Sequence, residues 1–208
     1  MRLNYFRDIS VIGQFADTPN HQGECDEPHR KCLFFGKLKT HRDFIQSTDL
    51  SLEDKNFWQT WFQKCANTQL HFTGKVKNNH SVWLFVIATE NGFMYGLISP
   101  SQDMQGRFCP FVVCAKTHSP DCLRLGLQRF FQIAFDFAKY VKQGVFLISN
   151  LINECDSHPK NQNDIVLPET FSLERISQNG SLWFECNNKQ AIESANVLSC
   201  FLFNKLFG

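Results

Sequence analysis

The sequence lacks an excess of charge of either sign. Its 21 Lys and Arg residues balance 20 Asp and Glu residues, so the formal net charge is +1. Nucleic-acid-binding proteins hold the phosphate backbone with clustered basic residues, and this chain has no surplus of them. Long hydrophobic runs are also missing, because the longest, Val82–Ala88, is far shorter than the roughly 20 residues that cross a bilayer. We therefore expect neither a nucleic-acid partner nor membrane insertion.

The N-terminal residues lack the uninterrupted apolar stretch of a secretory signal, because Arg2, Arg7 and Asp8 interrupt it. The chain has nine cysteines, and an odd number does not suggest a closed disulfide framework. These two features predict a cytoplasmic protein whose thiols are mostly reduced and buried.

Common catalytic and nucleotide-binding motifs are absent as well. The sequence contains no phosphate-binding GxxxxGKS or GxxxxGKT loop, no GxGxxG, no HExxH and no GxSxG. Nine Cys and seven His allow many nucleophile–base pairs, but no local signature marks one of them. We expect the cysteines within apolar runs to be small core residues rather than nucleophiles.

Apolar material is abundant, since hydrophobic residues make up 43% of the chain and include 22 Phe and 4 Trp. This composition predicts a deep core and excludes disorder as the main state. Residues 1–32 contain a polar stretch rich in Asp, Asn, His and Pro. We predict a partly flexible polar lead-in over residues 1–32 and a single domain over residues 33–208.

One set of potential metal ligands lies in the lead-in. Four residues form an HxxxCxxxHxxC pattern, and such ligands could in principle wrap a tetrahedral zinc ion. They are His21, Cys25, His29 and Cys32. The pattern matches no common zinc finger, so we favour scattered residues in a flexible segment over a zinc-stabilised adaptor. We expect no metal and no other cofactor.

Two long helices are well signalled. The first begins where Ser51 and Asp54 resemble a capping box. The second begins where Ser119 and Pro120 supply an N-cap and a proline at the first helical position, and it ends before Gly144. The apolar stripe of the first helix comprises Phe57, Trp58, Trp61, Phe62 and Cys65.

Shorter apolar runs predict strands. Three runs in close order predict an antiparallel meander, with Asn91-Gly92 as a hairpin turn between the first two. These runs are residues 82–88, 93–98 and 108–113. Further expected elements are a strand at 70–76, a hairpin joining 171–176 to 181–186, and a C-terminal helix at 191–206. Hairpins interleaved with buried helices predict an α/β domain with helices on both faces of a mainly antiparallel sheet.

Two polar segments are the candidates for a functional site. The first contains Lys37, Arg42 and Asp43, and the second contains Ser99, Ser101, Asp103 and Arg107. These side chains could form a polar site at one end of the sheet. We favour the alternative that the carboxylates accept backbone N–H groups in turns and pair with arginine, because structural ion pairs are commoner than sites.

The same segments, in order, resemble the TagF family of type VI secretion accessory proteins. The family's first motif reads roughly GKLP, a short gap, then GDF, and its second reads GxxxPSxDxxGRxxP. The matching residues here are Gly36, Lys37, Leu38, Asp43, Phe44, Gly96, Pro100, Ser101, Asp103, Gly106, Arg107 and Pro110. Residues 181–184, SLWF, resemble a late SLWW of the family. Departures are Lys39 in place of Pro, Arg42 in place of Gly and Phe184 in place of the second Trp.

The resemblance implies a three-layer α/β/α sandwich with a mainly antiparallel, mixed sheet. It also implies a cytoplasmic, non-enzymatic regulator that holds the secretion apparatus inactive. Family members are understood to act by binding the forkhead-associated scaffold protein of the system. The residues that the resemblance marks for partner binding or for the motif itself are Gly36, Lys37, Asp43, Phe44, Ser101, Asp103, Gly106 and Arg107.

One alternative remains open at this point. A small-ligand-binding or hydrolytic protein could use Asp43, Asp103 and Arg107, holding a phosphorylated substrate with Arg107 and Lys37. That hypothesis requires the three residues to converge in a concave pocket.

Overall fold

The computed structural model describes residues 32–69, 81–144, 150, 180–187, 190–194 and 199–207. Its strands are β1 (Leu33–Gly36), β2 (Ile45–Gln46), β3 (Trp83–Thr89), β4 (Gly92–Ser99), β5 (Phe111–Thr117), β6 (Ser181–Glu185) and β7 (Gln190–Ser194). Its helices are α1 (Leu52–Gln69), α2 (Pro120–Gln143) and α5 (Cys200–Phe207).

The described strands form one seven-stranded sheet in the order β2-β1-β5-β4-β3-β6-β7. Every pairing between these strands is antiparallel. The predicted meander is confirmed as β3, β4 and β5, although β5 begins at Phe111 rather than at residue 108. Thr89 pairs with Gly92, so Glu90 and Asn91 make the turn and Gly92, with a φ of 125°, opens β4.

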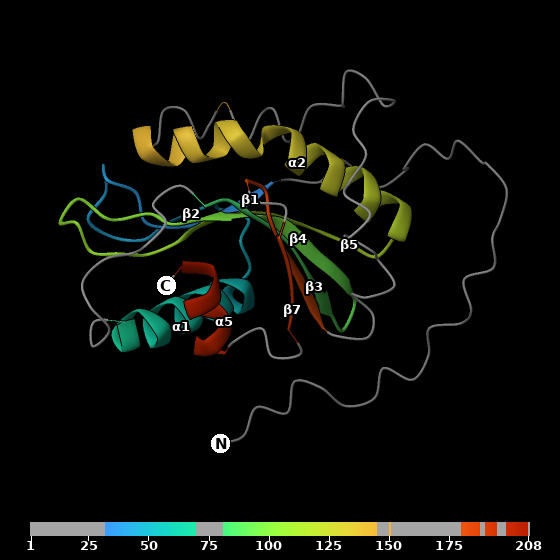
Figure 1. The fold of residues 1–208 in the computed structure, drawn as a ribbon, viewed down its shortest axis with the longest axis horizontal. Helices are drawn as coiled ribbons and strands as arrows, with labels where there is room; N and C mark the ends of the chain where they lie inside the picture. The colour runs from blue at the N-terminus through green and yellow to red at the C-terminus, as the bar shows by residue number, and fades with distance from the viewer. Residues whose placement is uncertain are drawn as a thin grey trace, which may run out of the picture.

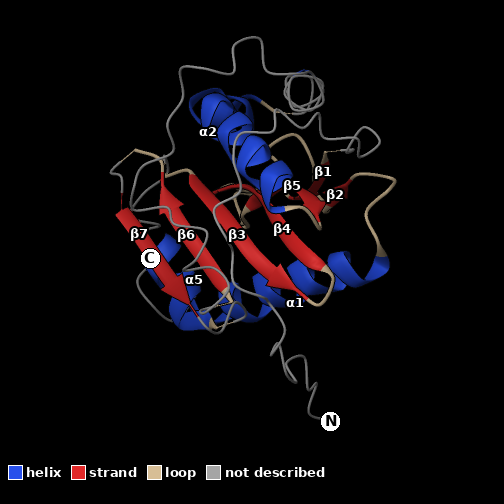
Figure 2. Ribbon diagram, turned by 90° about the vertical axis from the view of Figure 1, so that its right-hand side faces the viewer, coloured by secondary structure: helices blue, strands red, loops and turns tan. Residues whose placement is uncertain are grey.

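Helices cover both faces of this sheet (Figures 1 and 2). Because side chains alternate along a strand, Leu84 and Val86 of β3 face α2, whereas Trp83 and Phe85 face α1 and α5. Both sets are buried, which explains why the central strands read as continuous apolar runs. The predicted α/β class and the mainly antiparallel sheet are confirmed.

The two long helices begin where local signals place them. The Ser51 hydroxyl accepts a hydrogen bond from the Asp54 N–H at 3.1 Å and donates one to the Asp54 carboxylate at 2.6 Å. The Ser119 hydroxyl accepts a hydrogen bond from the Cys122 N–H at 3.3 Å, and α2 ends at Gln143 with Gly144 as its C-cap, as predicted. None of the helices in the described ranges is both long and apolar enough to cross a bilayer.

The C-terminal prediction is wrong in part. Residues 191–206 were expected to form one helix, but residues 190–194 form β7 and the helix is confined to Cys200–Phe207. The second strand of the expected hairpin is confirmed as β6, which pairs with β3 and β7, whereas its first strand, at 171–176, lies outside the described residues. The strand expected at 70–76 and the lead-in over residues 1–31 lie outside the described residues.

Candidate functional site

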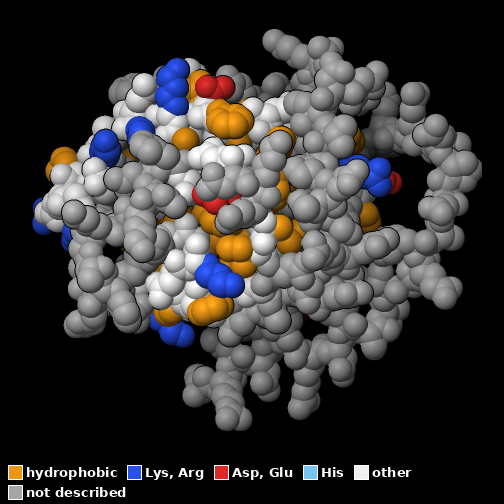
Figure 3. All heavy atoms as spheres, in the orientation of Figure 1, with side chains coloured by type: hydrophobic (Ala, Val, Ile, Leu, Met, Phe, Trp, Pro, Cys, Tyr) orange, Lys and Arg blue, Asp and Glu red, His pale blue; other side chains and the backbone are white. Residues whose placement is uncertain are grey.

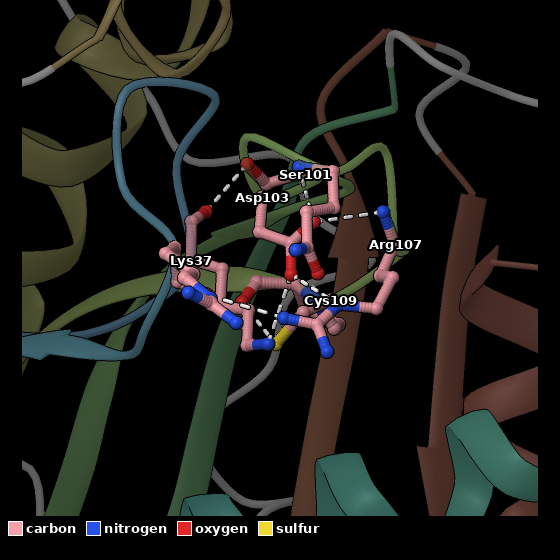
Figure 4. A network of polar contacts seen from close by, with 8 residues as sticks. Lys37, Ser101, Asp103, Arg107 and Cys109 are labelled. Carbon is pink, nitrogen blue, oxygen red and sulfur yellow. Dashed lines mark hydrogen bonds and ion pairs between the residues drawn. The ribbon is translucent and has the colours of Figure 1, made fainter.

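Two loops meet at one end of the sheet, as Figure 4 shows. The loop after β1 spans residues 37–44, and the loop between β4 and β5 spans residues 100–110; together we call them the loop platform. The Ser101 hydroxyl donates a hydrogen bond to the Lys37 carbonyl at 2.6 Å. The Met104 N–H donates one to the His41 carbonyl at 2.9 Å. These contacts join two segments that are distant in sequence into one unit.

The carboxylate of Asp103 lies at the centre of the platform and its side chain is fully buried. One oxygen, Oδ2, accepts hydrogen bonds from Lys37 Nζ at 3.1 Å and Arg107 Nε at 2.7 Å. The other, Oδ1, accepts the backbone N–H groups of Gln105 and Arg107, both at 2.9 Å. The two charged donors make these bonds stronger than neutral ones. Four donors therefore hold Asp103 in place.

The pKa of Asp103 shows which effect prevails. Burial raises the pKa of this carboxyl group, but the Arg107 N–H, the Lys37 ammonium and the other donors lower it by more than burial raises it. The resulting pKa is about 2, below the ordinary value. Asp103 is therefore a carboxylate with its acceptor sites in use, and it is not suited to hold a catalytic proton near neutral pH.

The geometry of the platform explains why two of the motif positions are glycine. Gly106 has a φ of 76°, which favours glycine, and its N–H donates to the Asp103 carbonyl at 2.9 Å, closing the turn. Gly36 has a φ of 145°, and a Cβ there would lie 2.5 Å from the carbonyl oxygen of Pro110. Both glycines thus serve the platform's backbone rather than a ligand.

Phe44 also has a structural role. Its ring stacks on that of Phe35 with centroids 4.9 Å apart, and the Lys37 ammonium lies 5.0 Å from the Phe44 centroid. Lys37 is therefore held between an aromatic face and the Asp103 carboxylate.

Asp43 does not join this network. Its side chain is exposed, and no hydrogen bond or ion pair links it to Asp103, Arg107 or any other part of the chain that the structure describes. The structure brings together Lys37, Ser101, Asp103 and Arg107, which the sequence singled out. It does not form the Asp43–Asp103–Arg107 cluster on which the hydrolytic alternative depends.

The outer surface of the platform carries a residue that sequence reasoning missed. Met104 is 62% exposed at the tip of the second loop. The Arg107 side chain is 57% exposed, and Arg42 and Asp43 are also exposed. Lys and Arg side chains, together with hydrophobic ones, lie along the edge of the molecule where these loops project (Figure 3). The only sequence signal for Met104 was an apolar residue inside a polar turn.

Three buried thiols, Cys109, Cys114 and Cys186, have the properties of core residues. Burial raises the pKa of Cys109, beneath the platform, well above its ordinary value, and raises those of Cys114 and Cys186 to about 12. A protonated thiol is a poor nucleophile. Six cysteines within the described ranges are reduced and five of these are buried, whereas Cys122 is disulfide-bonded.

The zinc hypothesis gains no support from the residues that can be placed. Cys32 is buried in the core on the α2 side of the sheet, while His21, Cys25 and His29 lie outside the described residues. Within those residues no three His, Cys, Asp or Glu side chains are grouped so as to hold a metal ion.

Comparison with known proteins gives one family and one fold. The family model for the TagF N-terminal domain, described as type VI secretion system-associated, matches residues 34–152. The crystal structure of PA0076 from Pseudomonas aeruginosa PAO1 is similar, with a TM-score of 0.62 and 17% sequence identity. That similarity covers 85% of this chain and 93% of the other. No curated protein matches.

Proposed function

The chain belongs to the TagF family of type VI secretion system-associated proteins, and on this premise we propose that it is a cytoplasmic, non-enzymatic negative regulator of the secretion apparatus. It acts by binding the forkhead-associated scaffold protein of that system, and so keeps the scaffold from the active assembly. The family's three-layer sandwich is part of the proposal, supported by α2 on one sheet face and α1 and α5 on the other.

The observation that carries the proposal is the braced platform with an exposed outer surface. Its backbone is fixed by hydrogen bonds between the loops and to Asp103, so little conformational entropy remains to be lost on binding. Methionine and arginine are enriched at protein interfaces. Met104, Arg42 and Arg107 present this combination on one surface.

The polar groups of the platform are engaged in holding its shape. Asp103 accepts four hydrogen bonds and Lys37 is paired with it. Burial keeps the nearby Cys109 thiol protonated by raising its pKa. These contacts favour a binding surface over a reaction centre.

Substitutions on the outer surface of the platform test the proposal without disturbing the hydrogen bonds to Asp103 that hold the two loops together. The double variant Met104→Asp, Arg42→Glu is expected to bind the purified scaffold at least about tenfold more weakly, because an apolar contact and a positive charge are both reversed. The double variant Phe135→Asp, Arg124→Glu is the matched control. It makes the same two changes at exposed positions of α2 and should bind like the unmodified protein. Calorimetric titration with the scaffold measures the difference.

Two outcomes would count against the proposal at different levels. If the unmodified protein does not bind the scaffold, or its overproduction leaves secretion at the normal level, the regulatory function is wrong. If the platform variant melts normally and binds as tightly as the α2 control, the function stands but the surface is wrong.

A further inference from the structure

Two thiols far apart in sequence lie together where α5 packs against α1. The Trp61 indole Nε1 donates a hydrogen bond to the Ser199 carbonyl at 3.3 Å, and the Trp61 and Phe203 ring centroids are 5.5 Å apart. Cys65 lies one turn beyond Trp61 on α1, and Cys200 follows Ser199. Cys65 belongs to the core cluster on this face and Cys200 packs against that cluster, close enough to raise the pKa of the Cys65 thiol.

The two thiols differ in access to solvent. Cys65 is completely buried, whereas Cys200 is partly exposed and is the one reduced cysteine in the described ranges that is not buried. Burial and then the neighbouring Cys200 raise the pKa of Cys65. An oxidant in solution therefore meets Cys200 first, with Cys65 beside it as a protonated second thiol.

We propose that Cys65 and Cys200 are a reversible redox site, a dithiol that a low-molecular-weight disulfide such as oxidised glutathione converts into a disulfide tying α5 to α1. The Cys200 thiolate attacks one sulfur of oxidised glutathione, the glutathione S–S bond breaks, and one glutathione leaves. Cys65 then loses its proton, and its thiolate attacks the Cys200 sulfur and expels the second glutathione as a thiolate, which takes up a proton. Two electrons and two protons pass from the cysteines to the oxidant, which becomes two glutathione thiols.

The disulfide would act on the helix that closes the core on this face. Trp83 Nε1 donates a hydrogen bond to the Leu206 carbonyl at 3.1 Å, so the end of α5 is attached to the sheet. Its buried residues are Leu202, Phe203, Leu206 and Phe207. A covalent link at the start of α5 would hold both ends of the helix in place. It would also close a long loop, which constrains the unfolded chain.

Oxidation of the purified full chain tests this site. After incubation with oxidised glutathione and digestion with trypsin, we expect a disulfide-linked peptide pair covering residues 65–75 and 190–205. The melting temperature of the oxidised protein should rise by about 5 °C or more. In Cys65→Ser the second step is blocked, so we expect glutathione to remain on Cys200 and the melting temperature not to rise. Cys186→Ser, which removes a buried thiol at another site, should form the link as the unmodified protein does.

The peptide map of the unmodified protein is decisive even if a variant folds poorly. A stable glutathione adduct on Cys200 without a link to Cys65 would overturn the proposal, and so would a failure of both thiols to react. Because scaffold binding is not measured here, either result leaves the proposed function untouched.

Discussion

Replacing Asp103 by asparagine is expected to lower the free energy of unfolding by about 3 kcal/mol at pH 7. Removing one member of a buried ion pair leaves its partners without compensation and typically costs 3 to 5 kcal/mol. We expect a loss at the lower end of this range, because the Arg107 side chain is 57% exposed and water can replace the lost carboxylate. The Lys37 side chain is only 13% exposed, so its ammonium is left in the protein without that compensation. Urea denaturation of the two proteins measures the loss.

The pH dependence of the same pair of proteins separates charge from shape. The pKa of Asp103 is about 2 in the folded protein, below its ordinary value of 3.8. Its ionisation therefore stabilises the fold above about pH 4, and this stabilisation is lost as the pH falls towards 2. From the size of the shift, the difference in stability between the two proteins should shrink by about 2 kcal/mol over that interval.

Asp43→Asn is the control for Asp103→Asn. It makes the same chemical change in the same platform at an exposed side chain, so its denaturation curve should match that of the unmodified protein. Equal stability of the two variants at pH 7 would show that the Asp103 network does not hold the platform together.

Local chemistry explains which parts of the fold could be predicted. The starts of α1 and α2 depend on Ser51 and Ser119, whose capping contacts lie within three residues along the chain. The turn from Asp103 to Gly106 is similarly local. Such signals are present in any short stretch of sequence, so they could be interpreted before the fold was known.

Contacts between distant segments could not be predicted. The Lys37–Asp103 ion pair joins residues 66 positions apart, and only the pairing of β1 with β5 and of β5 with β4 brings their loops together. Residues 190–194 are too few to reveal a strand or helix period. Their structure depends on hydrogen bonding to β6, which a helical pattern over residues 191–206 concealed.

Gly96→Ala is expected to lower the free energy of unfolding by about 3 kcal/mol or more, at the upper end for overpacking in a core. A Cβ at this position would lie 2.0 Å from the Val113 carbonyl oxygen and 2.7 Å from the Cys114 Cα. Both atoms belong to the backbone of β5. That strand cannot move away, because β1 pairs with its other edge, Leu33 opposite Cys114. Thermal and urea denaturation should both record the loss.

A second motif glycine supplies the matched control, because the two positions differ in the reason for glycine. At Gly106 a Cβ would meet nothing within 4 Å, but the φ of 76° is unfavourable for other residues. Gly106→Ala is therefore expected to cost only about 1 kcal/mol, the usual penalty of the left-handed conformation. If Gly96→Ala proved the milder change, β4 and β5 would have to lie further apart at this point than the structure places them. If the two losses were equal, space would not be what demands glycine at position 96.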